Sequence, residues 1–111
     1  MSLPYEYNIP KNRAGDSYSP FDITDLQADG VDMDLSNVTI VMHIKEGGSQ
    51  RAELTIGNGI TLLTANSIRV EIPKIPRVYG KLYWDIQFTF PGDIVKTLFK
   101  GTLEQEKDVT Q

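Results

Sequence analysis

Residues 81–105, KLYWDIQFTFPGDIVKTLFKGTLEQ, carry the most regular pattern in the chain. Apolar and polar side chains alternate from residue 82 to residue 90, which is the period of a β-strand with one buried face. Pro-Gly-Asp at 91–93 then supplies a fixed φ followed by a residue that tolerates positive φ, and a second apolar run at 94–103 follows at once. This stretch predicts two strands joined as an antiparallel hairpin.

One irregularity interrupts the second of these strands. Leu98 and Phe99 are adjacent, so both faces of the strand receive a bulky apolar side chain. A β-bulge at this point, or cover on both faces, is the expected result. In the first strand Trp84 shares a face with Ile86 and Phe88, which predicts that the indole belongs to the core.

Similar but shorter patterns extend through the rest of the chain. In the run at 51–56, for example, Ala52, Leu54 and Ile56 are expected to face inward. Turn signals recur about every ten residues, and no helical period is longer than one turn. The sequence therefore predicts an all-β fold, an immunoglobulin-like antiparallel β-sandwich of about seven to eight strands, with further strands expected at 21–24, 38–44, 60–62 and 68–72.

Length and composition fit a single folded domain over residues 1–111. We expect an extended N-terminal arm at 1–12, a sandwich core at 13–104 and a polar tail at 105–111. The chain has 40% hydrophobic residues, a net charge of −4 and a pI near 4.8, so a nucleic-acid backbone is an unfavourable partner. It has no cysteine, which excludes disulfides and thiolate metal sites, and its apolar runs are too short for membrane insertion.

Residues with catalytic potential are few. The single histidine, His43, has Met42 and Ile44 as neighbours, which point to the opposite face, so His43 is expected at the surface. Nothing near it in sequence suggests a nucleophile beside a base. An enzyme would need a carboxylate pair brought together by the fold, such as Asp85 with Glu71. We therefore predict no enzymatic activity, no catalytic residue and no cofactor.

An acidic loop at residues 25–34 is the one segment that raises the question of a metal. Its carboxylates are oxygen ligands of the kind that calcium takes. Aligning Gly30 with the glycine of a helix-loop-helix calcium site, however, puts Gln27 at the third position and Ser36 where a bidentate glutamate is required. We predict a solvated turn and no metal site; its carboxylates are Asp25, Asp29, Asp32 and Asp34.

Exposed aromatic side chains are the remaining candidates for binding. Tyr5, Tyr7 and Ile9 form an extended arm that either folds back on the domain or contacts a partner. Tyr79 and Tyr83 are candidates for a shallow sugar-binding surface. These two sets support different functions, a docking module and a carbohydrate- or surface-binding adhesin module.

Four segments resemble a family of small phage and prophage proteins: RAGDSYSPFDIT (13–24), VDMDLSNVTIVMHIKE (31–46), NGI (58–60) and YWDIQFTFPGDIVKTLFKGTLEQEKDVT (83–110). They are similar to the N-terminal immunoglobulin-like domain of baseplate upper proteins and to tail-fibre attachment modules. The matching positions lie in the core and turns, so they indicate fold more than function. The resemblance implies a non-enzymatic virion structural protein, made in the bacterial cytoplasm, whose partners are other tail or baseplate proteins or further copies of itself.

Overall fold

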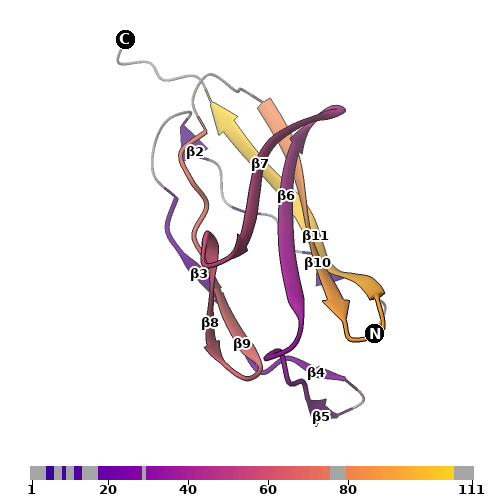
Figure 1. Ribbon diagram of the computed structural model, residues 1–111. Coiled ribbons are helices and arrows are strands. Elements are labelled where there is room, and N and C mark those ends of the chain that lie inside the picture. Colours follow the sequence, from indigo (N-terminus) through magenta and orange to yellow (C-terminus); the bar gives the residue numbers. More distant parts are fainter. Residues whose placement is uncertain are drawn as a thin grey trace.

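The protein is all-β in the residues that this computed structural model describes, which are 5–6, 9, 12–13, 18–28, 30–75 and 80–106 (Figure 1). This confirms the predicted class. The strands in chain order are β1 (Tyr5–Glu6), β2 (Asn12–Arg13), β3 (Phe21–Ile23), β4 (Gln27–Ala28), β5 (Val31–Asp32), β6 (Thr39–Glu46), β7 (Ser49–Ile56), β8 (Gly59–Thr64), β9 (Ser67–Val70), β10 (Gly80–Phe90) and β11 (Ile94–Glu106).

Hydrogen bonding joins nine of these strands in one curled sheet. Their order is β1-β11-β10-β6-β7-β8-β9-β3, and β2 also pairs with β11. The sheet is mixed, whereas the sequence predicted an antiparallel arrangement. β1 and β2 run parallel to β11, and β7 runs parallel to β8 over two residue pairs. β1 and β2 therefore run in the same direction as β11.

The β10–β11 hairpin matches its prediction closely. Gly92 has a φ of 89°, which fits the expected turn. Ile86 lies opposite Phe99 while Gln87 lies opposite Thr97, so Leu98 is the extra residue of a β-bulge. Leu98 is 3% exposed, which shows that the bulge turns this side chain into the core. The predicted bulge is confirmed.

The core lies on the inner face of the curled sheet and uses the apolar members of the alternating patterns. Trp84 is among them, as predicted, and its indole Nε1 donates a hydrogen bond to the Thr102 carbonyl at 3.3 Å. The most deeply buried apolar side chains are Leu35, Ile40, Met42, Ile44, Leu54, Ile60, Ile68, Val70, Leu82, Ile86, Phe88 and Leu103.

Two details of the pattern differ from expectation. Ile56 was expected to face inward but is 43% exposed at the last position of β7. The acidic loop, expected as a turn, contains a two-stranded ribbon of β4 and β5 that lies outside the main sheet. Figure 1 shows this ribbon beyond the end of the curled sheet.

A buried glutamine links segments that lie near opposite ends of the strand order. Gln105 is 1% exposed and belongs to β11, not to a polar tail as the sequence suggested. Its Oε1 accepts a hydrogen bond from the Tyr18 hydroxyl at 2.7 Å, and its Nε2 donates to the Ile75 carbonyl at 2.8 Å. Tyr18 precedes β3 and Ile75 follows β9, so these bonds, here called the Gln105 latch, link β11 to the opposite end of the strand order.

Candidate functional site

A row of charged and ionisable side chains crosses the outer face of four adjacent strands, β11, β10, β6 and β7. The register places Lys100 of β11 opposite Asp85 of β10, Asp85 opposite His43 of β6, and His43 opposite Glu53 of β7. Directly opposed residues share a face, so the four positions form one line across the sheet. This cross-strand row brings four ionisable side chains from four strands into one line.

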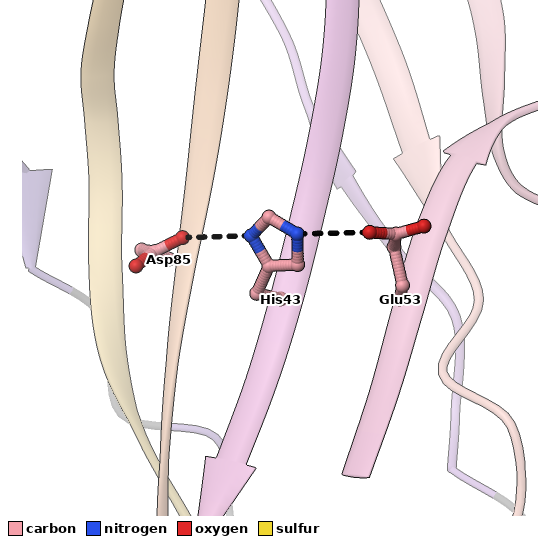
Figure 2. A network of polar contacts seen from close by, with 3 residues as sticks. All are labelled: His43, Glu53 and Asp85. Atoms are coloured by element: carbon pink, nitrogen blue, oxygen red, sulfur yellow. Dashed lines mark hydrogen bonds and ion pairs between the residues drawn. The ribbon is translucent and has the colours of Figure 1, made fainter. Parts of the chain in front are cut away.

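His43 lies between two carboxylates in this row (Figure 2). Its Nε2 is 3.0 Å from Glu53 Oε2, and its Nδ1 is 3.9 Å from Asp85 Oδ1. The side chains of His43, Asp85 and Glu53 are 21%, 33% and 49% exposed, respectively. His43 lies on the outer face, away from the buried Met42 and Ile44, as expected, but neighbouring strands cover most of its ring and supply two contacts that the sequence did not predict.

The Asp85 carboxylate is incompletely satisfied. Its Oδ1 is buried and has no hydrogen-bond partner among the described residues, although it is the oxygen that faces His43 Nδ1. A separation of 3.9 Å is too long for a hydrogen bond. Burial of an unpaired carboxylate oxygen is costly. A change of charge on His43 or Asp85 should therefore alter the free energy of the folded protein.

The geometry of the row does not converge on a metal ion. Figure 2 shows Glu53 and Asp85 on opposite sides of the imidazole, so their oxygens point toward the ring from two directions and not toward a shared point. No group of three or more potential ligands capable of holding a metal is found in the described part of the chain. The contacts of His43 with Asp85 and Glu53 connect β10, β6 and β7.

The carboxylate pair considered from the sequence is not brought together. Asp85 lies on β10, and Glu71 follows β9, where its backbone N–H donates to the Gly59 carbonyl at 2.7 Å. Strands β6, β7 and β8 lie between β10 and β9 in the sheet. Asp85 instead lies opposite His43, because β10 and β6 are neighbours in the sheet. The sequence alone does not show that these two strands are adjacent.

Two carboxylates of the acidic loop, Asp32 and Asp34, make local hydrogen bonds. Asp34 Oδ1 accepts the backbone N–H of Ser36 at 3.0 Å, and hydrogen bonding to Ser36 holds the pKa of Asp34 below its ordinary value. Asp32 Oδ1 accepts from Gln27 Nε2 at 2.8 Å across the β4–β5 ribbon. Asp29 lies outside the described residues. These contacts match the role of turn and ribbon residues.

The described residues of the N-terminal arm lie on the edge of their own sheet. Tyr5 pairs in register with Phe99, and the Ile9 N–H donates to the Thr102 carbonyl at 2.8 Å. Ile9 also packs against the core, while Tyr7 lies outside the described residues. The backbone of the arm therefore follows β11, and its contact with a partner stays a prediction.

Of the two tyrosines considered for sugar binding, the structure describes one. Tyr83 is 56% exposed on the outer face, opposite Lys45 on one side and Thr102 on the other. It stands two positions before Asp85 on the same strand, so it borders the cross-strand row. Tyr79 lies outside the described residues, and a glycan contact at either tyrosine stays a prediction.

No protein-family model matches the chain, and no curated protein matches it in sequence. The described residues form no helix long and apolar enough to cross a membrane. The resemblance to baseplate upper proteins is therefore a hypothesis that depends on the quoted segments alone.

Proposed function

We propose that this chain is a non-enzymatic structural module that docks on neighbouring subunits of a phage or prophage tail or baseplate. The observation that carries the proposal is the edge of β11, which accepts short strands laid along it. Among the described residues, β1 and β2 each pair with β11 over two positions, in parallel. An edge that accepts a strand from its own arm offers the same backbone groups to a strand from another chain.

The described pairs between the arm and β11 are parallel. Parallel pairing is slightly less stable per residue than antiparallel pairing, so we expect a strand from another chain to compete with the arm for this edge. Ile94 and Val95, at the start of the same strand, are 52% and 57% exposed and add apolar area beside the edge. We propose that the two halves of the curled sheet face each other across the core, as in an immunoglobulin-like sandwich. This arrangement is consistent with a docking role and with the quoted resemblance.

The location of the protein is the first test. Particles released from an induced culture of the source organism should contain the tryptic peptide of residues 82–96, LYWDIQFTFPGDIVK, in proportion to known tail components. Mass spectrometry of purified particles measures this. If the peptide were found only in the cytosol or on the cell surface, the virion proposal would be wrong.

The docking role of the edge has a separate test. The natural chain has no cysteine, so Glu6→Cys with Lys100→Cys introduces a single possible bridge at a register pair of β1 and β11. If the arm docks on a neighbour, oxidised particles or concentrated protein should contain bridges between chains, and deleting residues 1–10 should weaken assembly. Bridges confined to single chains, together with unchanged assembly after the deletion, would contradict strand docking.

A second candidate function, a carbohydrate-binding adhesin module, is favoured by the exposure of Tyr83 on a polar sheet face. An aromatic ring bordered by groups that donate and accept hydrogen bonds is a suitable surface for a sugar ring. A glycan array with the purified protein tests this. Binding should be lost in Tyr83→Ala and retained in Tyr83→Phe, because phenylalanine preserves the ring face; an array without signal would remove this candidate.

A further inference from the structure

We propose that His43 is a proton-operated clasp that holds β10, β6 and β7 together more tightly when its imidazole is charged. The clasp consists of His43 with Asp85 on one side and Glu53 on the other. It is independent of the docking role, since it concerns the outer face of the central strands and not the edge of β11. It rests on the geometry of the two contacts.

A neutral imidazole can donate a hydrogen bond to only one of the two carboxylates. A neutral imidazole has one N–H, and the 3.0 Å approach of Nε2 to Glu53 Oε2 places the proton there, because an ionised carboxylate has no proton to donate. Nδ1 then presents a lone pair to Asp85 Oδ1, another lone-pair acceptor. This explains why Oδ1 is buried without a partner and stands 3.9 Å away.

A second proton resolves this conflict. Protonation of Nδ1 creates a donor aimed at Oδ1 and places a positive charge between two negative ones. The row then alternates in sign from Lys100 through Asp85 and His43 to Glu53. Charge-assisted hydrogen bonds are shorter than neutral ones, so the Nδ1 to Oδ1 separation should close in the charged form.

Other charged groups around the ring do not cancel this effect. On its own strand, Lys45 lies two positions along the same face. On β7, the Arg51 guanidinium is bound to Glu46 at 2.7 Å. On β10 the facing ionisable groups are Asp85 and, two positions before it, Tyr83, and Lys100 on β11 lies opposite Asp85. The nearest charged partners of the ring are thus the two carboxylates.

The expected result is a stronger set of contacts across β10, β6 and β7 when the ring is charged than when it is neutral. The clasp then stabilises the fold more at lower pH than at higher pH. His43 is the only histidine in the sequence, so no other imidazole contributes to the pH dependence. From the usual strength of partly exposed ion pairs, the unfolding equilibrium constant should fall roughly threefold to tenfold between about pH 8 and about pH 5.5.

Urea unfolding across this pH range, followed by Trp84 fluorescence, measures the effect. His43→Gln is the matched control, because glutamine keeps a polar side chain without a titrating group, and its dependence on pH should be flat by comparison. In Asp85→Asn the amide N–H can donate to the lone pair of Nδ1. This contact should therefore favour a neutral ring, whereas the Asp85 carboxylate favours a charged one. Wild-type and His43→Gln profiles that run parallel would overturn the proposal.

A second measurement does not depend on any variant folding. Nitrogen-15 NMR of the single imidazole reports which ring nitrogen carries a proton. We expect a proton on Nε2 alone at the upper end of the range and protons on both nitrogens, with a slowly exchanging Nδ1–H, at the lower end. A neutral ring protonated on Nδ1, or an Nδ1–H that exchanges freely with water at low pH, would overturn the proposed clasp.

Discussion

Replacing Gln105 by alanine should destabilise the protein far more than a change near the end of a strand usually does. The substitution removes the acceptor for the Tyr18 hydroxyl and the donor to the Ile75 carbonyl, at a position that is 1% exposed. Two hydrogen bonds at about 1 kcal/mol each, and about 1 kcal/mol or more for polar groups left without their partner, give a loss of about 3 kcal/mol. That is a large part of the stability of an ordinary domain.

Urea denaturation followed by fluorescence is the appropriate measurement. Trp84 is the only tryptophan, and its indole is bonded to the Thr102 carbonyl of β11, so its emission reports on the strand that carries the latch. With a slope of about 2 kcal/mol per molar urea, the midpoint should fall by about 1.5 M. The slope itself should be unchanged if the sheet stays cooperative.

Two further variants separate the parts of the latch. Tyr18→Phe removes one hydrogen bond and should cost about 1 kcal/mol. Gln105→Glu keeps the size of the side chain but replaces the Nε2 donor by an acceptor facing the Ile75 carbonyl, so it should be at least as harmful as alanine at neutral pH. If Gln105→Ala and Tyr18→Phe shifted the midpoint equally, or if neither shifted it, the latch would not be what joins the two sides of the sheet.

Two other expectations follow from local geometry. The Arg69 guanidinium, hydrogen-bonded to Asp22 at 2.8 Å, holds the pKa of that carboxyl below its ordinary value. The pair therefore stabilises the fold above the ordinary pKa and loses this effect as the pH falls through the lowered pKa; an NMR titration should show the shift, and Arg69→Gln should abolish it. Gly59 has a φ of +96°, and a Cβ there would lie 2.6 Å from Leu54 Cγ, so Gly59→Ala should lower the free energy of unfolding by about 3 kcal/mol. Gly57→Ala, with a φ of +89° and open space around it, should cost about 1 kcal/mol in the same unfolding measurement, and equal losses at both positions would contradict the steric argument.

The parts of the fold that the sequence predicted are those with local causes. Alternation over 82–90 follows from the two-residue period of a strand, and the turn at 91–93 follows from the preferences of proline and glycine. The bulge at Leu98 was predictable because two adjacent apolar residues cannot both face one side of a regular strand. The parallel pairs at the edge had no such signal, because strand order depends on packing between distant segments.

The candidate site was missed for the same reason. His43, Glu53 and Asp85 become neighbours only when β10, β6 and β7 are placed side by side in one register. From the sequence alone, His43 had apolar neighbours on the opposite face and no visible partner. Gln105 was assigned to a polar tail because a glutamine among charged residues resembles a solvated end, although its amide is fully engaged in the structure.

The position of β11 affects how the protein is made. This strand holds β10 on one side and the arm on the other, and its Gln105 reaches Tyr18, which is 87 positions earlier in the chain. On the ribosome, everything up to β10 emerges before the strand that secures it, so the apolar inner face has no complete cover until residues 94–106 have left the exit tunnel. Contacts between such distant residues also slow the folding of β-rich proteins. Tyr18 and the arm therefore have no β11 partner until residues 94–106 have emerged, and a pause in translation before that point prolongs the time during which the growing chain is open to chaperones and proteases.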